Sequence, residues 1–212
     1  MEQQLVNLIK SGQKDRALQL MAKTWGTQIG RFCAVQTGSA SDGEDLLQET
    51  FIEAWGSLDS WRGEASLKSW LYGIARNLCA SHLRKKDRRR GLFQWFFGWG
   101  EEDNAHMRAS DDLLEASESQ LMLSEAVGRL KTAQREAVLL FYMSGLSMLE
   151  ISEVLDISPA NARKRVSLGV AALREDLRGE LMKPAGNELN GESDHDTEDN
   201  MSEYKRPRLI KS

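Results

Sequence analysis

Apolar residues recur at every third or fourth position along most of the chain, which is the spacing of the buried face of an α-helix. The longest such series predicts a helix from about Asp15 to Gln36. Ser41 and Glu44 then have the S-x-x-E spacing of a capping box, which predicts a second helix that runs to about Leu58. A third helix is predicted to begin near Ser66 and to continue into a cluster of basic residues. These elements form a first helical domain, residues 1–90.

Helical spacing breaks in residues 91–112, which we interpret as a linker. The stretch from Leu92 to Trp99 contains six large apolar residues and is followed by acids. This aromatic centre either packs under the domains as a small satellite core or docks on a partner protein. Helical spacing returns in residues 113–183, where Thr132 is expected to cap a helix. Residues 184–212 are polar and acidic without apolar periodicity, which predicts a disordered tail.

Two short helices joined by a tight turn are predicted within residues 113–183. Gly145 is expected to end the preceding helix in a left-handed conformation. Ser147 and Glu150 make a second capping box, for a helix from Met148 to Leu155. Asp156-Ile-Ser is then a turn.

The next predicted helix runs from Pro159, which suits a first helical position, to about Leu177, with Ser158 as its N-cap. Polar and basic residues near its start are what a helix in the major groove of DNA needs for base edges and phosphates. The pattern therefore predicts a helix-turn-helix. On this segment alone, the alternative is an ordinary helical hairpin with a solvated basic face.

The composition favours an all-α fold of two small helical domains joined by a linker, since prolines number only three and good helix formers are abundant. No apolar run approaches the roughly 20 residues of a membrane helix, and the N-terminus does not resemble a signal peptide. We therefore expect a cytoplasmic protein without membrane insertion. Cys33 and Cys79 are interpreted as core residues. Because no metal cluster, phosphate-binding glycine loop or nucleophile–base pattern is present in the sequence, we expect no enzyme activity and no cofactor.

The charge is unevenly distributed along the chain, although the formal net charge is only −4. Six basic residues lie between Arg84 and Arg90, and seven acids lie between Glu188 and Glu203. A protein that binds DNA alone usually carries a clear positive excess, because phosphate neutralisation supplies most of the non-specific affinity. We expect this chain to bind DNA poorly unaided, and we expect the acidic tail to shield the basic cluster in the free protein.

Two pairs of segments resemble the conserved regions of bacterial RNA polymerase sigma factors. Leu130-Lys-Thr-Ala-Gln-Arg-Glu-Ala-Val and Gly145-Leu-Ser-Met-Leu-Glu-Ile-Ser-Glu-Val-Leu-Asp-Ile-Ser resemble the fourth region. Asp45-Leu-Leu-Gln-Glu-Thr-Phe and Trp61-Arg-Gly-Glu-Ala-Ser-Leu-Lys-Ser-Trp-Leu-Tyr-Gly-Ile-Ala-Arg-Asn resemble the second region. The chain is most similar to the extracytoplasmic-function (ECF) group. This resemblance implies a subunit that binds core RNA polymerase, directs it to specific promoters, helps to melt them, and is held inactive by an anti-sigma factor.

The resemblance also implies three sets of contact residues. The clamp helices of the largest polymerase subunit would be bound by the outer face of the second helix: Asp45, Gln48, Glu49, Ile52 and Glu53. Minus-ten promoter DNA would be bound by the loop that follows and by the third helix: Trp61, Arg62, Gly63, Glu64, Ser66, Trp70, Arg76, Asn77, Ser81, Arg84 and Lys85. The minus-thirty-five element would be bound by the recognition helix: Asn161, Arg163, Lys164, Arg165, Ser167 and Leu168. The flap of the second-largest subunit is a further implied partner.

Some alternatives remain open from the sequence. Melted bases need a stacking surface or pocket, which Trp61 and Trp70 would supply unless they are core anchors. A stand-alone helix-turn-helix regulator would explain the second domain without any polymerase. An interaction protein, such as an anti-sigma factor or a scaffold, would explain the acidic tail and the aromatic linker.

Overall fold

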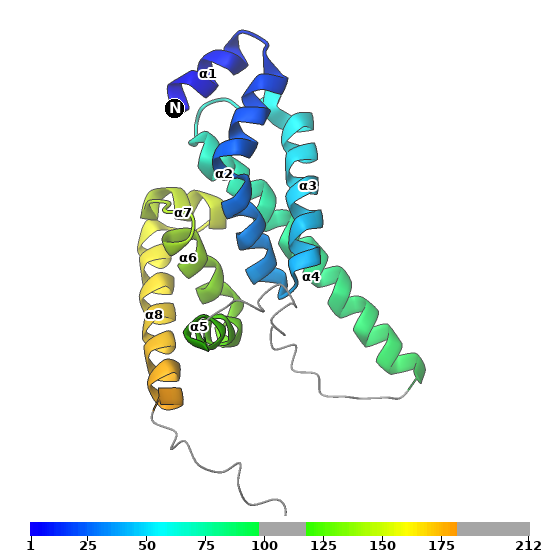
Figure 1. The fold of residues 1–212 in the computed structure, drawn as a ribbon, viewed down its shortest axis with the longest axis vertical. Coiled ribbons are helices and arrows are strands. Elements are labelled where there is room, and N and C mark those ends of the chain that lie inside the picture. The colour runs from blue at the N-terminus through cyan, green and yellow to red at the C-terminus, as the bar shows by residue number, and fades with distance from the viewer. Residues whose placement is uncertain (98–117, 182–212) are drawn as a thin grey trace, which may run out of the picture. The chain divides into compact units, whose positions relative to one another are not determined.

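The computed structural model describes residues 1–97 and 118–181, and these residues form helices and turns but no strand. The N-terminal domain contains α1 (Glu2–Lys10), α2 (Lys14–Thr37), α3 (Ala40–Ser57), the short 3-10 helix η1 (Leu58–Ser60) and α4 (Leu67–Phe97). The C-terminal domain contains α5 (Glu118–Arg129), α6 (Thr132–Tyr142), α7 (Met148–Leu155) and α8 (Pro159–Leu181). The predicted all-α fold with two helical domains is confirmed (Figure 1). No described helix combines the length and the apolar content that crossing a bilayer requires.

Helices α2, α3 and α4 lie side by side in the N-terminal domain (Figure 1). The predicted apolar face of α2 is buried or half-buried throughout, and Phe32 packs edge-to-face on Tyr72 of α4, with ring centroids 5.5 Å apart. Gly43 of α3 lies against the α2 backbone: a Cβ atom there would come within 2.7 Å of the Ala34 Cα. Only a residue without a side chain fits this crossing.

The start of α3 differs from the prediction, because the helix begins before Ser41. Gly38 ends α2 in a left-handed conformation with φ of 72°, and Ser39 then turns into extended backbone. The Ser39 hydroxyl accepts a hydrogen bond from the Asp42 amide at 3.1 Å. Ser39 is therefore the N-cap, and the predicted capping box of Ser41 and Glu44 is wrong.

Helix α4 also departs from the prediction, since it continues through residues 91–97 of the predicted linker. A single interior glycine such as Gly91 costs about 1 kcal/mol relative to alanine, which a helix already propagated through more than 20 residues tolerates. The first six residues of the predicted aromatic centre are thus helical in backbone. Trp99, the rest of the predicted linker and the acidic tail lie outside the described residues.

The C-terminal domain contains the predicted helix-turn-helix. Gly145 has φ of 63°, and both halves of the capping box between Ser147 and Glu150 are present at the start of α7. Asp156 closes α7 in a left-handed conformation, and the Ser158 hydroxyl accepts a hydrogen bond from the Asn161 amide at 3.3 Å. These features agree with the prediction.

The prediction that Thr132 caps a helix is wrong. Thr132 is the first residue of α6, and the N-cap position is Lys131, whose side chain makes no capping hydrogen bond. On α8, Ala162, Val166, Gly169 and Leu173 recur at helical spacing, and the first three are buried while Leu173 is half-buried. Gly169 lies so close to α6 that a Cβ atom there would come within 2.5 Å of the Val138 Cγ2. Close packing of α8 on α6 therefore fixes which face of α8 points outward.

Helix α1 was not predicted, although it is tied to the domain at two points. Leu5 is fully buried, and the Glu2 carboxylate accepts a hydrogen bond from the Leu67 amide at 3.2 Å. Because Leu67 is the first residue of α4, Glu2 supplies a cap from a distant segment.

Candidate polymerase and nucleic-acid interfaces

The residues predicted to bind the polymerase clamp share the outer face of α3, and all five of them are exposed. Ile52 is 71% exposed, which is unusual for a large aliphatic side chain. Trp55, which the sequence reasoning missed, is 55% exposed on the same helix, and its indole donates a hydrogen bond to Asp15. An apolar pair rimmed by Asp45, Glu49 and other acids is an ordinary pattern for a protein-binding surface.

The loop between η1 and α4 presents Arg62, Gly63 and Glu64 to solvent. Gly63 has φ of 78°, which favours glycine, and the Trp61 ring lies beside it. The Trp61 indole donates a hydrogen bond to the Ala65 carbonyl at 3.1 Å and packs on the core. Trp61 therefore holds the loop in shape.

Helix α4 carries the other residues predicted for minus-ten DNA. Asn77, Arg84 and Lys85 are exposed and Ser81 is half-buried. Trp70 packs against the core, as Trp61 does, so both tryptophans act as core anchors in this arrangement.

Ser66 and Arg76 are not available to DNA here, because both contact the C-terminal domain. The Ser66 hydroxyl donates a 2.6 Å hydrogen bond to Glu150 Oε1 of α7. Arg76 Nε lies 3.3 Å from Glu136 Oε1 of α6. Lys68, which the sequence did not single out, donates to the Ser144 carbonyl just before α7. Two of the predicted DNA contacts are thus part of a polar interface between the domains.

Glu150 joins the two domains electrostatically. Burial alone raises the pKa of its carboxyl group, but hydrogen bonds from Ser66 and from the backbone and side chain of Ser147, with Lys68 nearby, outweigh it. The pKa of Glu150 therefore lies below its ordinary value of 4.5, and the group is ionised at neutral pH. One carboxylate both caps α7 and binds Ser66 just before α4.

The residues predicted for the minus-thirty-five element lie along the first half of α8. Asn161, Arg163, Lys164, Ser167 and Leu168 are exposed, whereas Arg165 is half-buried. Leu168 is 47% exposed, beside the basic residues. This face has the cations and polar groups that contact phosphates and base edges.

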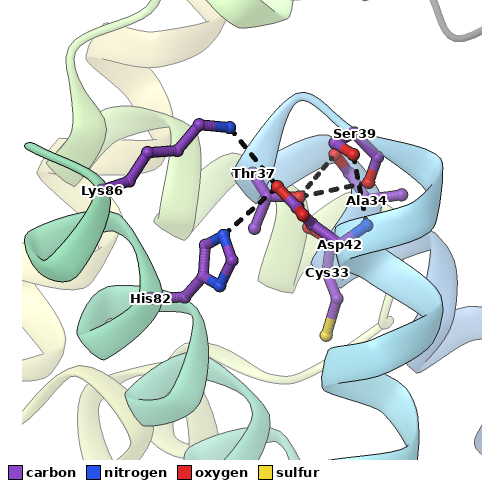
Figure 2. A network of polar contacts seen from close by, with 7 residues as sticks. All are labelled: Cys33, Ala34, Thr37, Ser39, Asp42, His82 and Lys86. Atoms are coloured by element: carbon purple, nitrogen blue, oxygen red, sulfur yellow. Dashed lines mark hydrogen bonds and ion pairs between the residues drawn. The ribbon is translucent and has the colours of Figure 1, made fainter. Parts of the chain in front are cut away.

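An ion-pair network that the sequence did not indicate joins α3 to α4. Figure 2 shows two side chains of α4 that reach the same oxygen of the Asp42 carboxylate: His82 Nε2 lies 3.2 Å and Lys86 Nζ 3.3 Å from Asp42 Oδ2. The Thr37 hydroxyl, at the end of α2, donates to the Cys33 carbonyl at 2.9 Å. Asp42 thereby links the start of α3 to the middle of α4.

The two cysteines are buried and unbridged, as predicted for core residues. The Cys79 thiol contacts the Cys33 thiol, and this contact together with burial raises the pKa of Cys79 far above the ordinary range. Such a thiol is a poor nucleophile at neutral pH. Within the described ranges, no group of three or more His, Cys, Asp or Glu residues is placed to hold a metal ion.

Comparisons with known proteins match both domains. Residues 21–89 match the family model for Sigma-70 region 2, and residues 120–173 match the model for Sigma-70 region 4. The ECF RNA polymerase sigma factor SigW of Bacillus subtilis is 30% identical over 178 residues, which cover 82% of this chain and 95% of SigW. The ECF RNA polymerase sigma factor SigC of Mycobacterium tuberculosis is 32% identical over 167 residues, which cover 76% of this chain and 83% of SigC.

A solved structure is similar as well. The sigma factor RpoE of Bartonella quintana, in complex with the anti-sigma factor NepR, has a TM-score of 0.62 and 27% sequence identity. The match covers 76% of this chain and 96% of the solved one. The likeness therefore extends over both helical domains.

Proposed function

The chain belongs to the RNA polymerase sigma factors of the ECF type, and we propose that its surfaces divide promoter recognition among α3, α4 and α8. As a sigma factor, it binds core RNA polymerase, directs it to promoters and helps to melt them. The polymerase supplies the chemistry, and the sigma factor supplies sequence recognition. What supports the division is that the exposed residues of the three sets lie on separate elements: α3, the loop before α4 together with α4, and α8.

The outer face of α3 is the polymerase-binding surface in this proposal. Ile52 and Trp55 supply an apolar centre, and Asp45, Gln48 and Glu49 supply the polar rim. Such a composition is typical of an interface in which one apolar contact carries most of the energy. The clamp helices of the largest subunit are the proposed partner, and the flap of the second-largest subunit is the proposed partner of the C-terminal domain.

The loop before α4 and the outer face of α4 bind the melted minus-ten region. In this proposal the exposed loop residues Arg62, Gly63 and Glu64 contact flipped bases, and the exposed cations Arg84 and Lys85 contact phosphates farther along the helix. The start of α8 binds the minus-thirty-five element in the major groove.

In the free protein, contacts between the two domains hold them together in a closed arrangement. The observation that carries this point is the hydrogen bond between Ser66 of the minus-ten loop and Glu150 of the helix-turn-helix, supported by the Arg76–Glu136 and Lys68–Ser144 contacts. Ser66 and Arg76 become available to DNA only when the domains separate. Binding to core polymerase, which needs the two domains at two separate promoter elements, drives this separation.

The same closed arrangement is a suitable target for an inhibitor. The Bartonella quintana sigma factor was solved in complex with an anti-sigma factor. This chain is also held by an anti-sigma factor in our proposal, and it acts in the cytoplasm, where the polymerase and the promoters are.

In-vitro transcription with core RNA polymerase tests the function. Core polymerase plus this chain should initiate at discrete start sites on genomic fragments, and core polymerase alone should not. A stand-alone regulator would instead protect a specific operator at physiological salt without polymerase. Such a footprint, together with absent transcription, would refute the proposed function. A scaffold or an anti-sigma factor would neither initiate transcription nor footprint DNA.

A further inference from the structure

The outermost part of α8 is a narrow sector of exposed side chains. Successive residues of a helix are rotated by about 100°, so between Pro159 and Ala171 a sector of about 80° contains four residues, all exposed: Ala160, Lys164, Leu168 and Ala171. The opposite side of the helix, with Ala162 and Val166, is buried. These four exposed residues are the outer sector of α8. When α8 enters the major groove, as proposed above, the outer sector faces the floor of the groove.

Cations flank the outer sector on both sides. Arg163 is exposed and Arg165 is half-buried, and they lie about 100° to either side of Lys164 around the helix. The major groove is about 12 Å wide, and a helix with its side chains has a diameter of about 10–12 Å. Residues on the flanks of α8 therefore face the two phosphate backbones, whereas the outer sector faces the base edges.

Leu168 is the one large apolar residue of the outer sector, and it is 47% exposed. A single exposed leucine is common on protein surfaces and needs no special explanation. Leu168, however, is exposed at a place where polar side chains ordinarily contact base edges. Its neighbours Ala160 and Ala171 are small, so they do not hold the helix away from the bases.

The chemistry of the base edges decides what Leu168 can contact there. Every base presents hydrogen-bond donors or acceptors in the major groove, but only thymine also presents a 5-methyl group. A leucine side chain forms no hydrogen bonds, so its contact with a donor or acceptor removes that group from water without compensation, which costs free energy. Contact with the thymine methyl group instead buries apolar surface on both partners. Thymine is therefore the base that a leucine at this position favours.

The spacing along α8 relates this base to the one that Lys164 contacts. Leu168 follows Lys164 by four residues, or about 6 Å along the helix axis. Neighbouring base pairs are stacked about 3.4 Å apart. The two side chains therefore reach bases that lie one or two base pairs apart.

We infer that Leu168 selects a thymine in the minus-thirty-five element by contact with its 5-methyl group, one or two base pairs from the base that Lys164 contacts. The contact rests on the proposed function, because it requires α8 to lie in the major groove of that element. Lys164 and Leu168 then read the DNA in different ways: the lysine donates to a hydrogen-bond acceptor, and the leucine covers a methyl group.

Deoxyuridine tests the contact, because its base differs from thymine only in lacking the 5-methyl group. The probe is a promoter fragment with a mapped transcription start, in which each thymine of the minus-thirty-five element is replaced in turn. Burying one such carbon changes a binding constant by about 4-fold. We expect at least one replacement to weaken binding of the assembled holoenzyme about 4-fold, and replacements in the spacer between the two elements to have no effect. Equal affinity for every modified element would overturn the inference.

Two leucine variants assign the effect to a residue. Holoenzyme with Leu168→Ala should bind the unmodified promoter about 4-fold more weakly or worse, and deoxyuridine at the sensitive position should weaken it no further. Leu123→Ala is the matched control, because Leu123 is also 47% exposed but lies on α5. The ratio of thymine to deoxyuridine affinity in this control should equal that of the parent. A deoxyuridine effect that persists in Leu168→Ala would refute the inference.

Transcription and core binding separate the possible failures. If transcription is initiated but no thymine is sensitive to replacement, the methyl contact fails alone. If core polymerase with this chain initiates no transcription, the proposed function fails, and the methyl contact fails with it. Equal loss of affinity for core polymerase and for the promoter in Leu168→Ala would make Leu168 a protein contact, which would also refute the inference.

Discussion

Replacing Lys68 with methionine should raise the affinity of the free protein for single-stranded minus-ten DNA. Lys68 donates a charged hydrogen bond from α4 to the Ser144 carbonyl of the other domain. Such bonds contribute about 1.5–3 kcal/mol, and because Lys68 is only half-buried we take about 1–1.5 kcal/mol. Methionine keeps the apolar part of the side chain and removes only the donor.

The size of the effect follows from the closed state. If most molecules are closed, the apparent affinity is the intrinsic affinity multiplied by the open fraction. A loss of about 1–1.5 kcal/mol from the closed state therefore raises the apparent affinity about 5- to 13-fold. The direction is informative, since removing a cation normally weakens DNA binding.

Fluorescence anisotropy with a labelled single strand from a mapped promoter measures this affinity. Lys23→Met is the matched control, because Lys23 is exposed on α2 and makes none of the described contacts between the domains. We expect the control to bind DNA as the parent does or slightly more weakly. Equal weakening in both variants would refute the closed state as the reason for low affinity.

Three further predictions concern packing, DNA recognition and pH. Gly43→Ala should be less stable than Gly56→Ala by about 1–3 kcal/mol in chemical denaturation, because both gain helix propensity but only Gly43 lies against another backbone. Equal stabilities would contradict this close approach. Lys164→Ala should weaken binding of the holoenzyme to a minus-thirty-five duplex by about 1 kcal/mol or more, without changing affinity for core polymerase. Equal loss of both affinities would contradict the division between surfaces. The pKa of Glu150 is lowered on folding, so its contribution to stability is present above pH 4.5 and is lost as the pH falls through the folded-state pKa. As the pH is lowered from 6 to 3, the melting temperature should fall less in Glu150→Gln than in the parent protein. Parallel curves of melting temperature against pH would count against this role of Glu150.

Local sequence signals were enough to predict the helix-turn-helix. Gly145, Ser147 and Ser158 each determine a cap through atoms within four residues of themselves, so their pattern can be read from the chain. Such signals also favour Ser41 as the N-cap of α3, because Glu44 follows it at the spacing of a capping box. The structure places the cap at Ser39, since the left-handed Gly38 decides which hydroxyl faces the first amides.

Contacts between distant segments could not be predicted in this way. Glu150 was recognised as a capping residue, but its other partner, Ser66, lies 84 positions away in the chain. Asp42 and its partners on α4 are likewise ordinary surface charges in the sequence. The sequence predicts residues for each proposed surface, whereas the packing of the domains decides which of them are covered.

The length of helix α4 sets the spacing between the loop before it and the basic residues along it. The helix is 31 residues long without interruption, and at about 1.5 Å per residue it spans about 46 Å. The distance and the angle between the loop before α4 and the cations at Arg84 and Lys85 are therefore set by the number of residues between them. Inserting one residue after Asn77 would move Arg84 and Lys85 along the helix axis by about 1.5 Å. It would also rotate them about that axis by about 100°, away from the DNA strand they are proposed to contact. In the proposed function, the rotation of the helix thus decides whether the loop and the cations can contact the same DNA strand.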